Sequence, residues 1–500
     1  MKNLKSWIVN ILAEAGLIES SIDVQYISFN PVPPYSHYDC TVRCHKLQSD
    51  AKEKISNIKI NYIKKIDLIG NYFNICFNYV EILPIINKVA NNETYGISDQ
   101  ICCKKIIVEH TSITPVYPIN LATYRSSVIG NAIDHTYSML GSEVDSHFFL
   151  EDTARQLNLL LRGIKMVDVE WKDSGKVDHS IGKIFYLAYL ENKKINANGE
   201  TIYRMFPFAN DKICLRHNSE DIVCNQEELT NISKECAKGH AETLRASSIN
   251  VEFYDLESEI IDTFNKSEFI RGEEIQDLIK NNRLSYSIKN AIYYAMLMRN
   301  ADRVFSVISK RQREVISTSI SELKDVNKIK VVFYGDVVIA NSQNLGLDSI
   351  REGCFNSVDQ YITEVSTKYN ISKELSVASL KYQILKCKTG EICTVSKEPY
   401  ETIQMILKYS TIINHLSSIS DESLQIGDME ILKEVFKFED VVSKLFKDFD
   451  YSNLITYLEK LCDLISNYMD NKHIEKTLAK AICRVLHNSF EFIGIDIQKL

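Results

Sequence analysis

The sequence predicts a multidomain α/β protein that ends in a mainly helical part. Three observations support this fold class. The apolar run Ile106-Ile107-Val108 leads into a loop and then a helix, which is how α/β sheets build a ligand site. The first hundred residues alternate helix and strand patterns, with Gly70 before an apolar strand, and predict an α+β domain. From about Ile371 onward the apolar spacing is typical of packed helices.

The composition is that of an ordinary soluble globular protein. The chain has 500 residues, of which 45% are hydrophobic and 25% charged, enough for two to four domains of about 150 residues each. No apolar run reaches the roughly 18 residues that cross a bilayer. The first residues resemble a signal peptide, but Asn10 and Glu14 interrupt the apolar stretch, so an amphipathic helix is the better interpretation. We therefore expect a cytoplasmic protein with no membrane partner.

Thirteen cysteines are scattered along the chain, and reduced thiols are expected because no export signal is recognised. The closest metal-like spacings are Cys40-x3-Cys44-His45 and Cys387-x5-Cys393. Neither has a matching second pair, so no metal site is predicted. The net charge of −8 argues against general adhesion to nucleic acid, while a local basic face still allows RNA binding.

The stretch from Lys104 to Asn131 closely resembles the first signature of class I arginyl-tRNA synthetases. In this register the HIGH tetrapeptide of the family is replaced by Asn120-Leu121-Ala122-Thr123, without either histidine or the glycine. The register is fixed by matches at Val108-Glu109, Ser112, Pro115, Pro118, Arg125-Ser126 and Ile129-Gly130.

Further matches follow in the order that the family has them. Glu151-Asp152 precedes Arg155-Gln156, and a helix is expected to open near Asp152. Lys176-Val177-Asp178-His179-Ser180-Ile181-Gly182 resembles the Lys-x-Asp-His-x-Ile-Gly motif of archaeal-type members, and Ala301-Asp302-Arg303-Val304 aligns without a gap. The resemblance implies that the substrate-binding positions are Glu109, Thr114, Tyr286, Asn290 and Gln312.

Two of these positions differ from the family. Thr114 replaces an asparagine, and Asn290 replaces the aspartate that pairs with the guanidinium of arginine. Loss of a buried carboxylate would leave that cation underpaired, at a cost of several kcal/mol. The ligand is therefore expected to be another small amino-acid-like molecule, or arginine bound weakly.

The second signature is also degenerate. Residues 347–353 match the KMS-x-R-x-Gly loop through Ser349, Arg351 and Gly353, but Leu347 replaces the leading lysine. The catalytic positions implied by the two signatures are thus Asn120, Thr123, Ser349 and Arg351.

The resemblance also implies a division into domains. Residues 1–100 correspond to an N-terminal domain like the one that binds the tRNA elbow, and 101–370 to a Rossmann-like class I synthetase catalytic domain with an insertion at about 165–260. Residues 371–500 correspond to the all-α, DALR-type anticodon-binding bundle.

Amino acid activation needs positive charge and hydrogen-bond donors where the phosphates of ATP gain charge. Removing one such donor costs about 10²–10³ in rate, and here three are absent together. Asn120 and Thr123 donate only neutral hydrogen bonds, which are weaker; Lys310 or Arg311 could supply charge from a new direction. Arginine activation is therefore expected to be lost or strongly reduced, with ATP and Mg bound only if nucleotide binding is retained.

Four interpretations stay open at the level of sequence. The first is a paralogue that binds tRNA as a monomer. The second is a divergent but active arginine–tRNA ligase, which aminoacylates tRNA-Arg with ATP. The third is a non-catalytic RNA-binding or regulatory protein, and the fourth an enzyme that uses aminoacyl-tRNA in specialised metabolism.

Overall fold

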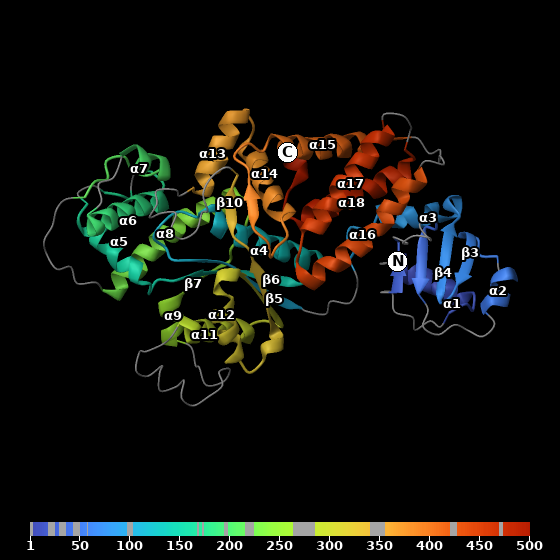
Figure 1. Ribbon diagram of the computed structural model, residues 1–500, viewed down its shortest axis with the longest axis horizontal. Helices are drawn as coiled ribbons and strands as arrows, with labels where there is room; N and C mark the ends of the chain where they lie inside the picture. Colours follow the sequence, from blue (N-terminus) through green and yellow to red (C-terminus); the bar gives the residue numbers. More distant parts are fainter. Residues whose placement is uncertain are drawn as a thin grey trace.

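The molecule is elongated, and its parts follow one another along the long axis (Figure 1). A small sheet from the first hundred residues lies at one end, a parallel sheet lies near the middle, and helices of residues 155–246 form the other end. The computed structural model describes residues 4–18, 26–29, 37–43, 51–57, 59–97, 104–167, 170–172, 175–194, 199–215, 225–263, 286–340, 356–420, 428–469 and 474–500.

Five parallel strands form the central sheet in the order β7-β6-β5-β8-β9. Their bounds are Lys105–Ile113 for β5, Glu143–Leu150 for β6, Phe253–Leu256 for β7, Arg303–Ser309 for β8 and Ile329–Tyr334 for β9. The predicted α/β class is confirmed.

Strand β5 lies at the centre of this sheet because it is apolar on both faces. Ile106, Ile107 and Val108 are almost fully buried, as expected for a parallel strand covered by helices on both sides. The strand order reverses at β5, with β6 on one side and β8 on the other. At such a switch point the loops that follow the strands diverge and leave a crevice for a ligand.

Helix α4 (Leu121–Met139) covers one face of the sheet, and α11 (Tyr286–Arg299) and α12 (Arg313–Ser321) pack in a second hydrophobic cluster on the other. Helix α4 approaches β5 closely at Gly130. A Cβ atom at this position would lie 2.1 Å from the Cβ of His110, so a larger residue would force the helix away from the strand.

The predicted insertion is helical. It follows α5 (Arg155–Lys165) and contains α6 (Val177–Lys193), α7 (Gly199–Met205) and α8 (Gln226–Ala246), after which β7 leads into α9 (Glu257–Thr263).

The prediction that a helix opens near Asp152 is wrong by about a turn, because α5 begins at Arg155. The buried Asp152 carboxylate instead accepts hydrogen bonds from the backbone N–H of Ser258 (2.8 Å) and the hydroxyl of Thr230 (2.7 Å).

The C-terminal part is helical, as predicted, apart from one short strand. Strand β11 (Cys393–Val395) pairs in parallel with β10 (Val337–Ile339). This pairing connects the C-terminal part to the segment that follows the central sheet. The helices are α13 (Val358–Tyr369), α14 (Lys373–Lys386), α15 (Tyr400–Ser417), α16 (Asp428–Asp448), α17 (Ser452–Met469) and α18 (Lys476–Phe492).

The N-terminal part is a four-stranded antiparallel sheet with helices, which agrees with the predicted α+β domain. Gly70 forms the turn between β3 and β4 with a φ of +60°, a conformation that glycine adopts without strain. The strand order is β1-β2-β4-β3, with bounds Ile27–Ser28 for β1, Cys40–Arg43 for β2, Ile63–Ile69 for β3 and Tyr72–Phe77 for β4; the helices are α1 (Leu4–Glu14), α2 (Ala51–Asn57) and α3 (Tyr79–Ala90).

This N-terminal part is bound to the C-terminal bundle through α16. The carboxylate of Glu439 accepts hydrogen bonds from the backbone N–H groups of Leu4 (2.7 Å) and Lys5 (3.4 Å), which are otherwise unpaired at a helix start. The neighbouring Asp440 accepts from the backbone N–H of Phe29 at 3.2 Å and forms an ion pair with the side chain of Lys5. Contacts across the boundaries at about residues 100 and 370 are thus extensive, and the division into 1–100, 101–370 and 371–500 stays a prediction.

Candidate functional site

A cavity of about 350 Å³ lies where β5, β8 and β9 end and α4 begins. This is the switch point of the sheet, where a ligand site is expected. Four predicted site residues line the cavity: Thr114, Asn120, Thr123 and Gln312. These four residues come from two segments of the chain, and the whole lining comes from four: residues 112–123, 151–156, 309–312 and 334–336.

Asn120 is the N-cap of α4. Its side-chain oxygen accepts a hydrogen bond from the backbone N–H of Thr123 at 2.8 Å, and its backbone is extended, as N-cap residues usually are. A helix N-terminus can bind an anion because its first N–H groups are unpaired. Since Asn120 already pairs the amide of Thr123, one of these donors is unavailable to a ligand.

The segment that follows the second signature contacts the first signature directly. Asn120 forms an isolated antiparallel bridge with Ser357, and the backbone N–H of Val358 donates to the carbonyl of Ile119 at 3.0 Å. Ser357 also caps α13 through the backbone N–H of Gln360 at 3.2 Å. The predicted catalytic residues Ser349 and Arg351 lie outside the described residues.

The charged groups on the cavity wall are carboxylates and one guanidinium. Arg311 precedes Gln312 in a short 3-10 helix (Lys310–Gln312) and forms a two-pronged ion pair with Asp336, at 2.8 and 2.9 Å. Across the cavity, Glu151 accepts a hydrogen bond from the hydroxyl of Thr114 at 2.7 Å. Among the described lining residues two carboxylates thus face one guanidinium, which favours a ligand without a large negative charge.

Glu109 is not among the residues that line this cavity. It lies in β5 and is 1% exposed, and its carboxylate accepts hydrogen bonds from the hydroxyls of Ser112 (2.6 Å) and Ser306 (2.5 Å). Burial raises the pKa of Glu109 to about 7, which favours the neutral form of the carboxyl group. Of its two partners, Ser306 is fully buried and Ser112 lines the cavity, so Glu109 is connected to the cavity through Ser112.

The remaining two predicted substrate contacts are on α11. Asn290 is buried beside the apolar residues of this helix and does not line the cavity. Tyr286 is the first residue of α11, and its side chain lies outside the described part of the chain.

Arg125 is a residue that sequence reasoning used only to fix the register. Its guanidinium is fully buried and donates to five backbone carbonyls, without a carboxylate. The acceptors are Gly335 (2.9 Å), Asp336 (3.1 Å), Lys388 (2.9 Å), Thr389 (3.2 Å) and Glu391 (2.7 Å). Arg125 therefore attaches the helix of the first signature to the two segments that lead into β10 and β11.

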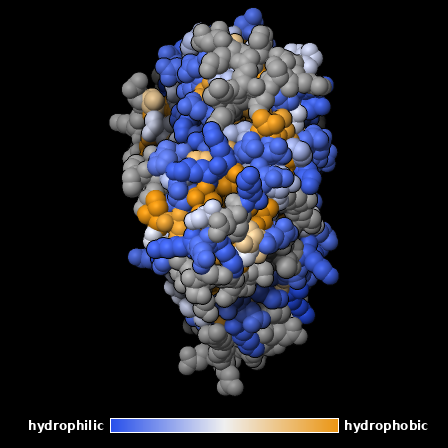
Figure 2. Space-filling model, turned by 90° about the vertical axis from the view of Figure 1, so that its right-hand side faces the viewer, coloured by the Kyte–Doolittle hydropathy of each residue, from blue (hydrophilic) through white to orange (hydrophobic). Residues whose placement is uncertain are grey.

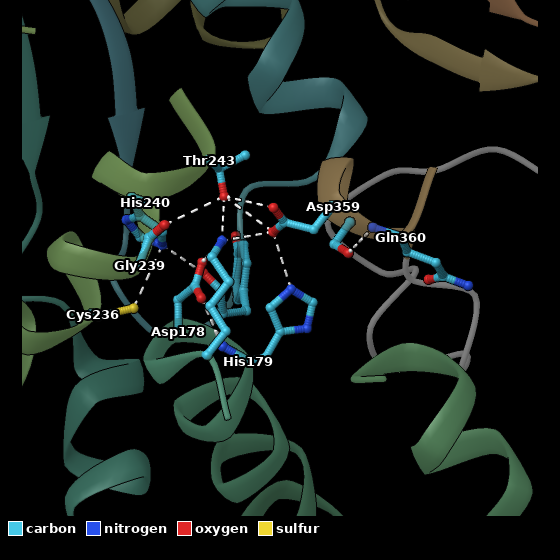
Figure 3. Close-up of polar contacts among 11 residues, drawn as sticks. Asp178, His179, Cys236, Gly239, His240, Thr243, Asp359 and Gln360 are labelled. Atoms are coloured by element: carbon cyan, nitrogen blue, oxygen red, sulfur yellow. Dashed lines mark hydrogen bonds and ion pairs between the residues drawn. The ribbon is translucent and has the colours of Figure 1, made fainter. Parts of the chain in front are cut away.

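The Lys-x-Asp-His motif meets the helix that follows the second signature (Figure 3). Figure 3 shows the carboxylate of Asp359, from α13, directed toward His179 and Thr243. His179 Nε2 lies 3.1 Å from one carboxylate oxygen, and the Thr243 hydroxyl lies 3.0 Å from the same oxygen. The Lys176 ammonium completes the group at 2.7 Å from Asp359 and 3.3 Å from Asp178. We call Lys176, Asp178, His179, Thr243 and Asp359 the insertion cluster.

The insertion cluster is held in its charged form by its own geometry. Burial by itself would raise the pKa of Asp359, but the hydrogen bond from His179 and the charge of Lys176 lower it well below the usual range. Burial likewise opposes the charge of Lys176, yet Asp178 and Asp359 together raise its pKa. The cluster fixes the position of α13, and the small residue Gly239 is needed beside it, because a Cβ there would lie 2.4 Å from the carboxyl carbon of Asp178.

Within the described residues, His, Cys, Asp and Glu side chains do not gather in groups of three or more that could hold a metal ion. The predicted absence of a metal site stays a prediction. Among the same residues, no helix is both long enough and apolar enough to cross a bilayer.

Comparison with known protein families gives one match. Residues 399–499 match the DALR anticodon binding domain, which corresponds to α15 through the end of the chain. This match covers α15 to α18 and confirms the predicted DALR class of the C-terminal part; the predicted boundary at residue 371 stays a prediction.

Sequence relatives cover most of the chain. An arginine–tRNA ligase of Methanococcus maripaludis is 22% identical, over 89% of this chain and 89% of that protein. The arginine–tRNA ligase of Methanosphaera stadtmanae is also 22% identical, over 90% of this chain and 84% of that protein.

Solved structures show the same fold over the whole length. The arginyl-tRNA synthetase of Thermus thermophilus superposes with a TM-score of 0.68 and 13% identity, covering 98% of both chains. That of Plasmodium falciparum gives a TM-score of 0.64 with 14% identity and covers 99% of both.

Proposed function

Because the chain belongs to the arginyl-tRNA synthetase family, we propose that it binds tRNA, as a monomer in the cytoplasm, and that its activation of arginine is lost or strongly reduced. The cavity at the switch point is proposed to accept arginine or another small amino-acid-like ligand. The helix cap at Asn120 is the observation that carries the proposed loss of activation.

In the family, the first signature supplies imidazoles at the start of this helix. In this chain the equivalent start has the neutral amide of Asn120, whose oxygen is occupied by the backbone of Thr123. The nearby guanidinium of Arg311 is already paired with Asp336. Stabilisation of the charge that develops on the phosphates needs donors that are already oriented toward it, and the described residues offer few.

The cavity residues do not fit a triphosphate well. Glu151 and Asp336 are both on the wall, and a nucleotide would place its negative charge close to them. The first turn of α4 and the hydroxyl of Thr123 could hold a single phosphate group. We therefore expect binding of ATP, with Mg, to be weak.

Two observations support tRNA binding. The DALR match places a known anticodon-binding type of domain at residues 399–499. At the edge of the N-terminal sheet, Lys59, Lys64 and Lys65 line a hollow of about 370 Å³ beside β3. Figure 2 looks onto this end of the molecule, where hydrophilic residues surround a group of exposed apolar ones. Cationic side chains on such a surface are suited to RNA phosphates.

A second candidate is a divergent but active arginine–tRNA ligase. The position of Arg311 favours it, because this guanidinium lines the same cavity as Thr123 and Gln312. Release from Asp336 would bring a positive charge to a bound phosphate. A third candidate is a non-catalytic RNA-binding or regulatory protein, which differs from the first by having no small ligand.

The deciding experiment is tRNA-dependent ATP–pyrophosphate exchange by the full chain, with each amino acid offered in turn. We expect no exchange, from protein that still retains tRNA on a filter. Exchange with arginine would establish the second candidate, and Arg311→Ala should then abolish it. Arg313→Ala is the matched control, since this neighbouring guanidinium lies over the ring of Phe333 and does not line the cavity. Exchange with a different amino acid would show a change of specificity.

The proposed RNA surface has its own test. Lys59→Glu combined with Lys64→Glu should weaken tRNA retention about tenfold or more at low salt, because each charge pairs with a phosphate. Lys104→Glu is the control, since this exposed lysine precedes β5 of the central sheet and does not line the hollow. An equal loss in both variants would remove the N-terminal sheet from the proposal.

A further inference from the structure

Two cysteine side chains meet at a single backbone oxygen. Cys387 ends α14 and Cys393 begins β11, and the sulfurs lie 3.4 and 3.9 Å from the carbonyl oxygen of Gln383. Both thiols donate to this one carbonyl. The two thiols are therefore neighbours in space as well as in sequence.

The two thiols differ in access. Cys387 is partly exposed, whereas Cys393 is fully buried. The hydrogen bond from Cys393, with the positive charges of Arg125 and Lys386 behind it, lowers the pKa of Cys387 to about 6. Burial raises the pKa of the partly exposed Cys76 and Cys483. The lowered pKa of Cys387 favours the thiolate, the form that reacts with oxidants, and this side chain is partly exposed to solvent.

The loop between the two cysteines is held on several sides. Arg125 donates hydrogen bonds to the backbone carbonyls of Lys388, Thr389 and Glu391. The hydroxyl of Thr389 donates to the carbonyl of Phe449 at 2.9 Å. The backbone N–H of Cys393 donates to the carbonyl of Asp336 at 2.8 Å. These contacts keep both ends of the loop in place, so the thiols stay close without a disulfide.

We propose that Cys387 and Cys393 form a reversible thiol-oxidation site, in which a hydroperoxide oxidises Cys387 and Cys393 then closes a disulfide. This inference goes beyond the proposed function and does not depend on it.

The atoms balance in two steps. The thiolate of Cys387 attacks one oxygen of hydrogen peroxide; an S–O bond forms, the O–O bond breaks, and the leaving hydroxide takes a proton to become water. The sulfur of Cys393 then attacks the sulfur of the resulting sulfenic acid. An S–S bond forms, the S–O bond breaks, and the hydroxide leaves as water with the proton of Cys393. Two electrons pass from the thiols to the peroxide.

The two cysteines lie close to residues that position the candidate site, so their oxidation could change that site. The loop that the disulfide would close carries three of the five acceptors of Arg125, and Arg125 lies in the helix that Asn120 caps. Asp336, which holds Arg311 at the cavity, also supplies one of the other two carbonyls. Oxidation would therefore change the contacts of Arg125 that hold α4, while the two cysteines themselves do not line the cavity.

The test uses the full chain at neutral pH with an equimolar amount of hydrogen peroxide, followed by alkylation and tryptic mapping. Trypsin cuts after Lys386 and Lys388, so Cys387 and Cys393 fall in different peptides and a disulfide joins them. We expect this linked pair to form first, and dithiothreitol to reverse it. Earlier oxidation of the exposed Cys214, or oxidation of Cys387 to a sulfinic acid without any linked peptide, would overturn the proposal.

Variants distinguish the role of Cys387, which is oxidised first, from that of Cys393, which closes the disulfide. Cys393→Ala should let a sulfenic acid accumulate at Cys387, where a dimedone probe traps it, and should raise the pH at which Cys387 is half alkylated above its value of about 6. Cys387→Ser should leave Cys393 reduced under the same peroxide. Cys214→Ser is the control and should still form the linked peptides. A half-alkylation pH that is the same with and without Cys393 would contradict the proposed pairing.

Discussion

The insertion cluster and the cavity beside the first signature are connected through α8, but their charged groups have different partners. Tyr117 lines the cavity, and its carbonyl oxygen lies 2.8 Å from Nε2 of His240, on the same helix as Thr243 of the insertion cluster. In the cluster, the carboxylate of Asp359 has a lysine, a histidine and a hydroxyl as partners. In the cavity, the helix start is capped by a neutral amide, and the guanidinium of Arg311 is paired.

The two regions therefore differ in role: one holds helices in position, and the other would have to stabilise charge during a reaction. The groups that hold α13 and α4 in position are charged and hydrogen-bonded, although Nδ1 of His179 and Nε of Arg125 are buried without a partner. The groups at the cavity that could stabilise a developing charge are neutral or already paired. The insertion cluster therefore has a structural role that is separate from the chemistry of the cavity.

The largest expected effect comes from breaking the insertion cluster. Asp359→Asn removes the charge that Lys176 and His179 face in a mostly buried site, and we expect a loss of about 4 kcal/mol in the free energy of unfolding. Urea denaturation of the full chain measures it. Glu398→Gln is the matched control, because this exposed carboxylate pairs with the exposed Lys368 and should contribute little. Equal effects in the two variants would contradict the structural role of the cluster.

The second effect concerns the attachment of α4. Arg125→Lys keeps the charge but has three donors for five carbonyls and no planar fork. We expect a loss of about 3 kcal/mol, since buried carbonyls are left without partners. Arg162→Lys, on the exposed side of α5, should change the melting temperature little. If Arg125→Lys melts as the wild type does, the carbonyls have found other donors.

The third prediction contrasts two buried lysines. Lys176 lies among carboxylates, whereas Lys381 is 1% exposed and donates to the carbonyls of Gly494 (2.8 Å) and Ser248 (3.4 Å). Burial lowers the pKa of Lys381 from 10.5 to about 7. Between these values the unfolded chain binds more protons, so the free energy of unfolding should rise with pH, by at most about 1.4 kcal/mol per pH unit.

Denaturation at several pH values between 7 and 10 checks this slope. Lys381→Met fills the same space without a titratable group, and the rise with pH should be smaller in this variant by the contribution of Lys381. A slope that is unchanged in Lys381→Met would show that other groups cause it.

The smallest effect tests the cap. Asn120→Ala should cost about 1 kcal/mol, because the amide of Thr123 loses its acceptor. Asn120→Asp keeps an acceptor and should restore stability, but it adds a negative charge to the cavity wall and should weaken nucleotide binding further. Thermal melts and a nucleotide titration distinguish the two variants. Stability lost equally in both would mean that the acceptor at position 120 is not what stabilises the start of the helix.

The fold could be predicted from local patterns. The apolar run at Ile106-Ile107-Val108 has to be buried on both faces, and this places β5 in the middle of a parallel sheet. Because the carboxyl ends of neighbouring parallel strands meet at one edge, Thr114 and Gln312 could be expected near each other. The helix bundle at the end followed from its apolar spacing.

Other features could not be read from the sequence. The acceptors of Arg125 are backbone carbonyls from distant segments, and any residue type supplies a carbonyl, so no pattern marks them. Asp359 lies far in sequence from Lys176, and only the folded chain brings them together. Glu109 was expected at the ligand, yet β5 is buried at that point and directs the carboxylate toward Ser306. Its role as a substrate contact stays a prediction.

The attachment of the first helix to α16 has a consequence for partners. Glu439 and Asp440 join the beginning of the chain to the bundle near its end, so the separation between the N-terminal sheet and the helices of residues 399–499 is set by side-chain bonds. An RNA that touches both surfaces at once must match that fixed span. Molecules of the right local sequence but the wrong length or bend would reach one surface only, which makes overall shape a criterion of selection.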